Sequence, residues 1–522
     1  MSEITTYPFN AEQVVQVCEY HFGMNWPVVY ILENKKEVYI GETVSAYSRS
    51  RQHLENSDRR RLNRMHIVTD EEFNKSAALD IESLLIQYMS AEGSLVLQNG
   101  NKGLVDHNYY DREKYQAKFE TIWDKLKAMS LVSKDLKDIR NSDLFKFSPF
   151  KALTVDQILV ADQILEILRT KTEATIVISG KPGTGKTILA IYLMKRLKEE
   201  EEFKQLKTAL VVPMASLRET LKGVFSFVKN LSGGMVKGPS HVTDSSYDLL
   251  IVDEAHRLHR RRNIVNYASH DKTNQKLGLA NDGTELDWIM KSARYKILFY
   301  DEKQHVRPSD VTPADFKKLA ATHLDLQTQK RVEGGDEYIQ FIDSLFNESK
   351  GLPAFKDYDF KIFDSLELMV KQIDEREKEV KLSRLVAGYA WEWISKKNKA
   401  LYDIEIDGVK LKWNSVNTDW VNSPNSANEV GCIHTIQGYD LNYTGVIIGP
   451  EMTYDPISEQ LKVVKGNYKD RNGHAGVDDS AELERYIFNI YRTLLTRGMK
   501  GTYVYAVDPE LRAYLKRCLL GE

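Results

Sequence analysis

The sequence predicts an α/β protein of several domains: a small α+β domain, followed by two lobes that each contain a parallel β-sheet. The chain has 522 residues, which is too long for one compact core. From about residue 150 onward, apolar strand-like runs alternate with amphipathic helical segments, the pattern of parallel sheets covered by helices. Before residue 110, two strand-like runs are instead joined by a short turn, which favours a separate, smaller domain.

We expect the chain to divide into four segments. The small domain occupies residues 1–110, a helical connector residues 111–150, the first parallel-sheet lobe residues 151–335 and the second lobe residues 336–522. The connector is rich in charged and helix-forming residues, so we interpret it as a solvated helix.

The composition excludes several classes of protein. The net charge of −3 does not indicate a strongly basic nucleic-acid-binding protein, although a large enzyme can hold a basic groove within a balanced total. The three cysteines lack metal-ligand spacing, which argues against a zinc site and a disulfide framework and fits a reducing cytosol. The polar start of the chain is unlike a signal peptide, and the apolar runs are too short to span a membrane. We therefore expect a soluble, cytoplasmic protein without a membrane partner.

The small domain opens with the runs PVVYILE (27–33) and EVYIGET (37–43), which we interpret as adjacent strands. A helix is expected within residues 70–93, where apolar residues recur at helical spacing and Gly93 ends the pattern.

Five polar residues of this domain form a candidate catalytic set. Tyr30 and Tyr39 stand at corresponding places in the two strands. Arg49 and His53 follow, four residues apart on one face of an expected helix, and Glu82 interrupts an otherwise apolar helix. A structural role stays open for each, because tyrosines on adjacent strands commonly pack together and a lone Glu is often ion-paired.

A phosphate-binding loop is expected at the start of the first lobe. Residues 180–187 fit the pattern G-x-x-x-x-G-K-[ST] and lie between the strand-like run TIVIS and an amphipathic helix. In that setting the backbone N–H groups surround the phosphates of a nucleotide. Lys186 is expected to reach the β- and γ-phosphates, and the Thr187 hydroxyl to bind Mg²⁺. The expected nucleotide-binding residues of this loop are Gly180, Gly183, Thr184, Gly185, Lys186 and Thr187.

Two further strand-like runs end in polar residues that we assign to the same site. YDLLIVDEAH ends in Asp253, which we expect near the metal, and in Glu254, which we expect to activate the attacking water as a general base. A kinase needs no water-activating Glu here, so this pair favours hydrolysis. YKILFYDEKQ ends in Asp301 and Gln304, and Gln304 is either a sensor of the γ-phosphate or an ordinary exposed residue.

These motifs, over about residues 150–515, resemble those of superfamily 1 helicases, and most closely the Schlafen-like helicase group. LTVDQ, with Gln157, resembles the adenine-reading Q motif, and VVPMASLRETL resembles motif Ia. DEAH and DEKQ resemble motifs II and III, and QTQKRVEGG, with Arg331, resembles motif IV. IHTIQGYDLNYTGVIIG resembles motif V, with Asp440 where Glu is usual, and NIYRTLLTRGMKG, with Arg497, resembles motif VI.

This resemblance implies two RecA-like P-loop lobes that bind ATP with Mg²⁺ and hydrolyse it. Arg331 and Arg497 would bring positive charge to the transition state, with Arg492 a weaker candidate. A nucleic-acid strand would be held across the lobes, with DNA favoured over RNA. The resemblance adds Gln157, Gln437 and Gly438 to the nucleotide site and assigns Ser216, Arg218, His434 and Thr435 to nucleic-acid binding.

Two other features allow both a functional and a structural interpretation. Trp391, Trp393 and Trp413 would either stack on bases or pack in the core on one side of a helix, and we favour the core. The basic run HRLHRRRN (256–263) is either a nucleic-acid contact or a solvated face.

Residues 26–102 resemble the GIY-YIG nuclease domain. The second half of that motif is intact as YIG at 39–41, whereas the first half is VVY at 28–30, without the leading glycine. The distances along the chain from the YIG glycine to Arg49 and His53 suit the family pattern.

The nuclease resemblance implies a role for each residue of the candidate set. Glu82 would be the single protein ligand of a catalytic Mg²⁺, which stabilises the leaving group. Tyr30, with Tyr39 nearby, would take the proton from the attacking water. Arg49 would hold the phosphate charge, and His53 would orient the reacting groups or share the proton transfer.

The resulting hypothesis is a Mg²⁺-dependent endonuclease fused to an ATP-driven helicase or translocase, with a role in defence against foreign (phage) DNA or in DNA repair. The alternative is an ATP-controlled switch that gates the nuclease or a partner without translocation. In a third interpretation, the N-terminal domain only grips DNA. A homo-oligomer or a regulatory partner protein is left open.

Overall fold

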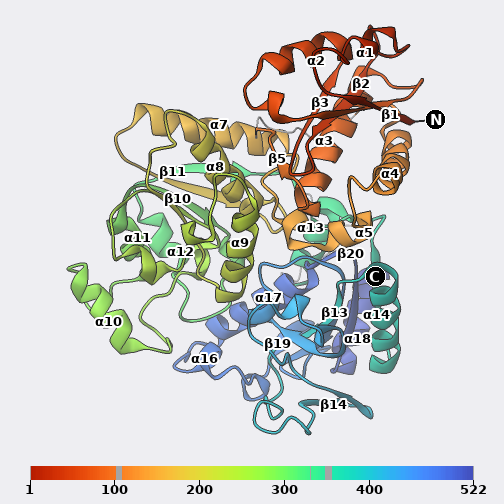
Figure 1. The fold of residues 1–522 in the computed structure, drawn as a ribbon. Helices are drawn as coiled ribbons and strands as arrows, with labels where there is room; N and C mark the ends of the chain where they lie inside the picture. Colours follow the sequence, from red (N-terminus) through yellow and green to blue (C-terminus); the bar gives the residue numbers. More distant parts are fainter. Residues whose placement is uncertain (1, 101–108, 330, 347–354, 521–522) are drawn as a thin grey trace. The chain divides into compact units, whose positions relative to one another are not determined.

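The computed structural model describes residues 2–100, 109–329, 331–346 and 355–520 (Figure 1). The chain divides into two compact units. The N-terminal unit comprises Met1–Ala161, Ile191–Gln205 and Gly223–Gly233, and the C-terminal unit comprises Asp162–Ala190, Leu206–Lys222 and Gly234–Glu522. The predicted end of the GIY-YIG-like segment, residue 102, lies outside the described residues.

The N-terminal unit contains a five-stranded sheet in the order β1-β4-β2-β3-β5, antiparallel except for the β3–β5 pair. Its strands are β1 (Glu3–Pro8), β2 (Val28–Glu33), β3 (Glu37–Thr43), β4 (Arg64–Thr69) and β5 (Val96–Leu97). Its helices include α1 (Gln16–Glu19), α2 (Ala46–Glu55), α3 (Lys75–Glu92), α4 (Arg112–Ala128), α5 (Leu136–Asn141) and α6 (Asp143–Lys146). Helices α2 and α3 cover opposite faces of the sheet (Figure 1). Gly93, in a left-handed conformation with φ of +80°, ends α3 as predicted.

The interpretation of the connector as a solvated helix is wrong. Helix α4 buries one apolar stripe in the same core as α3. The stripe repeats at helical spacing, and the charged residues occupy the rest of the helix surface, so charge content alone was a misleading guide. The buried side chains are Tyr115, Phe119, Ile122, Trp123 and Leu126.

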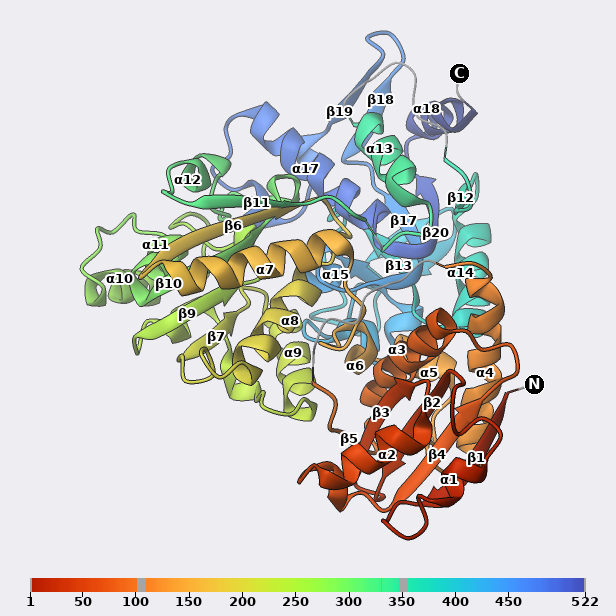
Figure 2. The same cartoon turned by 90° about the horizontal axis from the view of Figure 1, so that it is seen from above.

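The first sheet of the C-terminal unit has six strands in the order β11-β6-β10-β9-β7-β8, and every neighbouring pair is parallel (Figure 2). Its strands are β6 (Ala174–Gly180), β7 (Thr208–Val211), β8 (Val236–Lys237), β9 (Tyr247–Val252), β10 (Ala293–Tyr300) and β11 (Thr322–Leu326). The helices of this region are α7 (Val155–Thr170), α8 (Lys186–Glu199), α9 (Ala215–Phe227), α10 (Tyr267–Lys276), α11 (Glu285–Ser292) and α12 (Pro313–Lys317).

The second sheet of this unit is also parallel, in the order β12-β20-β17-β13-β16. Its strands are β12 (Asp359–Ile362), β13 (Ser383–Ala387), β16 (Val430–Cys432), β17 (Leu441–Ile448) and β20 (Gly498–Ala506), with hairpins β14 (Ile404–Ile406)–β15 (Val409–Leu411) and β18 (Met452–Asp455)–β19 (Gln460–Val463) beside it. Its helices are α13 (Gly335–Leu345), α14 (Leu366–Val380), α15 (Ile433–Ile436), α16 (Arg471–His474), α17 (Ser480–Leu495) and α18 (Pro509–Leu520).

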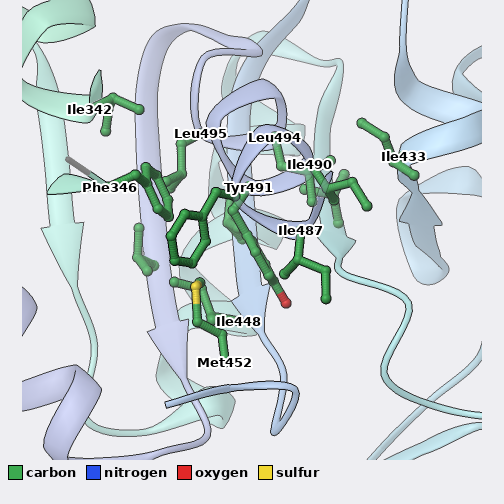
Figure 3. Close-up of a cluster of buried hydrophobic side chains, with 14 of the residues drawn as sticks. Ile342, Phe346, Ile433, Ile448, Met452, Ile487, Ile490, Tyr491, Leu494 and Leu495 are labelled. Carbon is green, nitrogen blue, oxygen red and sulfur yellow. The ribbon is translucent and has the colours of Figure 1, made fainter. Parts of the chain in front are cut away.

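The core of the second lobe lies between α17 and its sheet. Ile487, Tyr491 and Leu494 of α17 are buried with Ile448 of β17 and with Phe346, which follows α13 (Figure 3). The two parallel sheets confirm the α/β architecture that the alternating pattern predicts.

The three tryptophans belong to a core, as the favoured interpretation holds. Trp413 is buried and stacks on Tyr389 with ring centroids 5.4 Å apart, while Trp391 and Trp393 are half-buried against the same cluster. The structure differs in one respect, because Trp391 and Trp393 lie in irregular chain instead of on a helix.

The strand order decides where the candidate site forms. Strand β10 lies between β6 and β9, so the loops that follow these three strands meet at one edge of the sheet.

In the described part of the chain, no helix is long and apolar enough to cross a membrane.

Candidate functional site

The phosphate-loop motif forms the turn between β6 and α8. Gly183 and Gly185 have φ of +86° and +73°, a region that favours glycine. A Cβ atom on Gly180 would lie 2.6 Å from the Thr184 hydroxyl. The glycines are thus required by backbone geometry, and α8 begins at Lys186 directly after the turn. This is the geometry that presents backbone N–H groups to a phosphate.

Lys186 is buried and points back into its own loop. Its Nζ donates to the carbonyl oxygens of Gly180 at 2.5 Å and Lys181 at 3.1 Å, and to Asp301 Oδ2 at 3.2 Å. Burial opposes ionisation of Asp301, but the charge of Lys186 lowers the pKa of Asp301 below its usual range. Asp301 therefore holds the ammonium group, a role that the sequence motif alone did not assign.

Thr187 and Asp253, the two residues that the sequence assigns to the metal of the nucleotide, lie side by side. The Thr187 hydroxyl donates to Asp253 Oδ2 at 2.7 Å. Asp253 is 1% exposed, and its Oδ1 has no hydrogen-bond partner among the described residues. Burial, with the charge of Glu254, raises the pKa of Asp253 above its usual range. A buried carboxylate oxygen with no partner, beside a threonine hydroxyl, is a donor set that fits Mg²⁺.

Glu254 follows β9 in a strained conformation, with φ of +51° in the left-handed region. Its Oε2 lies 2.8 Å from His256 Nε2. Burial opposes ionisation of Glu254, but the neighbouring His256 lowers its pKa, so the carboxylate is charged at neutral pH. A charged carboxylate at this strand end is suited to accept a proton from water.

A chain of side chains runs from Lys186 to Arg497 of the second lobe. Gln304 Nε2 donates to Asp301 Oδ2 at 2.7 Å, and Arg497 Nη2 donates to Gln304 Oε1 at 3.4 Å. Arg497 is 1% exposed. Burial, with the adjacent charge of Arg331, lowers the pKa of Arg497 to about 10. Gln304 is therefore not an ordinary exposed residue, because it joins two groups of the site.

The motif IV and motif V residues lie next to this chain. Arg331 Nε is 2.6 Å from Asp440 Oδ1, so the Asp that stands in place of the usual Glu still forms an ion pair. A Cβ atom on Gly183 would lie 3.0 Å from Arg331 Cβ, which brings Arg331 against the phosphate loop. Gln437 is 1% exposed, and neither atom of its amide has a hydrogen-bond partner in the part of the chain that the structure describes. Gly438 has φ of +90°.

Gln157 belongs to the N-terminal unit, where its Oε1 accepts from the backbone N–H of Thr154 at 3.0 Å. Its role in reading adenine stays a prediction.

Ser216 and Arg218, both assigned to nucleic acid, are engaged within the protein. The Ser216 hydroxyl lies 2.9 Å from the Tyr439 hydroxyl and accepts from the backbone N–H of Asp419 at 2.8 Å. Arg218 Nη1 donates to the carbonyl oxygen of Val212 at 2.8 Å. Burial lowers the pKa of Arg218. Nucleic-acid binding by these two residues stays a prediction.

His434 and Thr435 have similar internal contacts. His434 Nε2 lies 2.8 Å from Asp470 Oδ2. Thr435 is buried, and its hydroxyl accepts from the backbone N–H of Cys432 at 3.1 Å, which caps α15. Their assignment to nucleic acid likewise stays a prediction.

The basic segment 256–263 is not a solvated face. Arg257 is buried, with its Nη1 2.6 Å from Asp310 Oδ2. Arg262 Nη1 lies 3.2 Å from Glu482 Oε1 of the second lobe. All four arginines of the segment pair with Asp or Glu, so the run of positive charge is neutralised locally.

The tyrosine cluster forms on the α2 face of the N-terminal sheet. Tyr30 is opposite Gly41 in the β2–β3 register, and its ring lies across that glycine, where a Cβ atom would be 2.2 Å from the Tyr30 hydroxyl. The hydroxyl lies 2.7 Å from His53 Nε2 and accepts from Arg49 Nε at 3.4 Å. Tyr39 packs against His53 with ring centroids 5.0 Å apart.

The charges around this cluster keep His53 neutral. Burial, with the charges of Arg49 and Arg59, lowers the pKa of His53 to about 4. Burial raises the pKa of Tyr30, although Arg49 acts in the opposite direction. Arg59, which stands 3.9 Å over the Tyr39 ring, was not predicted from the sequence. The basic run RRR at 59–61 was the available signal.

Glu82 lies on α3, where burial and the charge of Glu42 raise its pKa to about 7. Glu42 was also missed from the sequence, and it pairs with Lys75. Two carboxylates with one raised pKa mark a place where a cation would be stabilised. Within residues 2–100, 109–329, 331–346 and 355–520, no group of three or more His, Cys, Asp or Glu residues could hold a metal ion. Asn99 braces the YIG strand, because its Nδ2 donates to the carbonyl oxygen of Ile40 at 2.7 Å.

Comparison with known proteins covers mainly the C-terminal unit. Residues 173–508 match the family model described as Schlafen group 3, DNA/RNA helicase domain. The uncharacterized protein YPL245W of Saccharomyces cerevisiae is 26% identical over 425 residues, which is 70% of this chain and 90% of that protein.

Two solved helicase structures are also similar. Arterivirus nonstructural protein 10, a helicase in complex with DNA, has a TM-score of 0.30 and 14% identity over 66% of this chain and 63% of the viral chain. Pif1 helicase from Bacteroides, in complex with ADP-AlF3 and ssDNA, has a TM-score of 0.29 and 13% identity over 70% of this chain and 97% of that chain. TM-scores this low support no further conclusion.

The family match includes the phosphate loop, the strand ends with Asp253 and Asp301, and Arg497. It covers more than half of the chain, and both parallel-sheet lobes lie within it. The chain therefore belongs to the Schlafen group 3 DNA/RNA helicase domain family, a family of helicase-type P-loop ATPases.

Proposed function

We propose that this protein hydrolyses ATP to drive movement along nucleic acid, and that its N-terminal unit cleaves phosphodiester bonds. The motor proposal rests on one observation above all: the continuous contact from Lys186 through Asp301 and Gln304 to Arg497. This chain links the phosphate loop of one lobe to a buried arginine of the other, so a change at the nucleotide is transmitted between lobes.

The residues of the site have distinct tasks in this reaction. Thr187 and Asp253 would hold the metal of a bound Mg²⁺–ATP, which supplies charge neutralisation at the phosphates. Lys186 leaves its loop carbonyls to contact the phosphates. Glu254 accepts a proton from water at its carboxylate, and Arg497 contributes positive charge from the second lobe.

The motor is tested by ATP hydrolysis with and without single-stranded DNA or RNA. We expect a severalfold stimulation, and Lys186→Ala to abolish hydrolysis while Lys181→Ala, an exposed lysine of the same loop, retains it. A rate that no nucleic acid changes would refute the motor and leave the ATP-controlled switch. Hydrolysis by the Lys186→Ala protein would refute the phosphate-loop assignment.

Support for the nuclease is the polar cluster around the Tyr30 hydroxyl. His53 is neutral at pH 7, so it orients this hydroxyl without adding positive charge. Tyr30 is then placed to take a proton from water as its own phenol proton passes to the neutral His53 Nε2, and Arg49 is placed to neutralise the phosphate. Glu82 would hold Mg²⁺, which stabilises the leaving oxygen as a Lewis acid.

The nuclease is tested with labelled single- and double-stranded DNA and RNA, with and without ATP and Mg²⁺. We expect Mg²⁺-dependent cleavage that Glu82→Ala abolishes, while Glu71→Ala, an exposed glutamate of the same unit, has no effect. Unchanged cleavage by Glu82→Ala would refute the assigned site. Binding without cleavage by the wild type would favour an N-terminal unit that only grips nucleic acid.

The proposal favours DNA as the substrate, and defence against foreign DNA or DNA repair as the cellular role. The DNA substrate and the cellular role are both inferred from the presence of a nuclease and a motor in one chain. No individual residue supports them.

A further inference from the structure

A pocket of about 270 Å³ lies beside α10, away from the phosphate loop. Its lining includes His270 of α10, Trp288 of α11, Arg307 after β10, and Asn472 of the second lobe. We call it the α10 pocket. Its volume lies just below the range of about 300–1,000 Å³ for small-molecule sites, which suits a single base with its sugar.

His270 contributes a buried imidazole ring to the lining of this pocket. The residue is 5% exposed, and in the described chain its Nε2 has no hydrogen-bond partner. Trp288 Nε1 donates to Asn274 Oδ1 at 2.6 Å, which fixes the orientation of the Asn274 amide. Asn274 Nδ2 donates to the carbonyl oxygens of Asn281 at 3.2 Å and Gly283 at 3.0 Å, and it lies 3.4 Å from His270 Nδ1. Burial lowers the pKa of His270 below its usual value, which favours the neutral ring.

Arg307 supplies a hydrogen-bond donor and connects two cavities. Its Nε is buried, with no hydrogen-bond partner in the described ranges, and its Nη2 makes only a 3.4 Å contact with Asp470. Arg307 also lines a neighbouring pocket of about 240 Å³, together with Arg260 and Arg485. Glu302, Asp310 and Glu482 also line that second pocket and Arg260 pairs with Glu482, so it is the Arg307 guanidinium, at the border of the α10 pocket, that suits a backbone phosphate.

The outer wall of the α10 pocket is apolar. Val265 is 95% exposed and lines it together with Ile264. An aliphatic side chain this exposed gains free energy when the flat face of a ligand covers it. The His270 ring, which packs on Trp288 with centroids 4.7 Å apart, is the aromatic part of the wall.

We infer that the α10 pocket binds one unpaired base of a nucleic-acid strand, with His270 donating to a ring nitrogen or carbonyl of the base and Arg307 binding the adjacent phosphate. This inference rests on the proposed function, because it names the place where the translocated strand is gripped. Bases offer both an acceptor edge and an apolar face, the two properties that the pocket complements.

The test uses full-length protein and two fluorescein-labelled single strands of equal length. One is an ordinary DNA oligonucleotide, and the other has the same backbone without bases. The ratio of their dissociation constants, measured by fluorescence anisotropy, isolates base recognition from phosphate binding. The variants are His270→Ala and, because the His270 ring is buried, Ser269→Leu on the exposed rim of the pocket. His323→Ala, an exposed histidine on β11, is the matched control.

We expect the base-dependent ratio to fall about fivefold or more in both pocket variants and to stay unchanged in His323→Ala. Equal ratios in the wild type and both pocket variants overturn the inference and leave the motor intact. A wild-type protein that binds neither strand, and no RNA of the same sequence, overturns the proposed function itself.

Discussion

The nucleotide site and the tyrosine cluster use buried polar groups in different ways. In the nucleotide site, Lys186, Asp301, Gln304 and Arg497 come from three separate parts of the chain and form one line of contacts. In the tyrosine cluster, residues within a short stretch meet because two paired strands run directly into one helix. The first arrangement joins the two lobes, and the second surrounds one hydroxyl with neighbouring polar groups.

The glycines of the two sites show the same contrast. Gly183 and Gly185 are needed because their backbone is left-handed. The backbone of Gly41 is not left-handed. Glycine is needed there because the Tyr30 ring occupies the place that a side chain would take. Glycine thus serves loop conformation in one site and close packing in the other.

The largest effect is expected when the line of contacts is broken at Arg497, its end in the second lobe. Arg497→Ala should lower ATP hydrolysis about 1,000-fold, because an arginine at the transition state contributes a factor of this order. The measurement is steady-state phosphate release with single-stranded DNA present. Arg492→Ala, which loses a contact with Asp343 outside the line, should keep most of the activity. Equal losses in both variants would contradict the assignment.

Removing the Tyr30 hydroxyl tests the tyrosine cluster separately from the nucleotide site. Tyr30→Phe should lower phosphodiester cleavage about 100-fold while ATP hydrolysis is unchanged, because the ring still packs but cannot accept a proton. Cleavage and hydrolysis are measured on the same preparation, and Tyr47→Phe on α2 is the control. Full cleavage by Tyr30→Phe would remove the tyrosine from the mechanism.

Filling the space beside Tyr30 tests the packing role of glycine. Gly41→Ala should destabilise the N-terminal unit by about 1–3 kcal/mol, since the new Cβ atom overlaps the ring. Calorimetric melting of the full-length protein gives the change. A Cβ atom on Gly100 would meet no atom of the described residues within 4 Å, so the melting of Gly100→Ala should match the wild type. An unshifted transition for Gly41→Ala would show that the ring is free to move aside.

The smallest expected effect is a pH dependence confined to the tyrosine cluster. The pKa of His53 is about 4 in the folded protein, against 6.5 when exposed, so the unfolded state binds a proton that the folded state excludes. The free energy of unfolding therefore loses nothing to His53 above pH 6.5, and it falls as the pH drops from 6.5 toward 4. His53→Gln should lessen that fall in the melting temperature of the N-terminal unit. An identical pH profile in wild type and variant would show that the folded state accepts the proton.

Much of the nucleotide site could be predicted because its motifs are contiguous. The phosphate loop, the DEAH strand end and the alternation of strands and helices are short-range patterns. Such patterns can be recognised in a sequence when no structure is available. The role of Asp301 could not be predicted, since it depends on β10 lying between β6 and β9. The packing of α4 was missed because its charged residues concealed the apolar stripe.

The sequence by itself determined the class of the main strands and helices of the sheets and the identity of the chemical groups, because the spacing of apolar residues and local motifs follow from backbone geometry. Tertiary structure alone decided which of those groups meet. It paired Arg331 with Asp440, placed Arg59 over Tyr39, and left His270 facing a pocket. The physical reason is that such contacts join residues through strand order and burial, which no local pattern in the chain records.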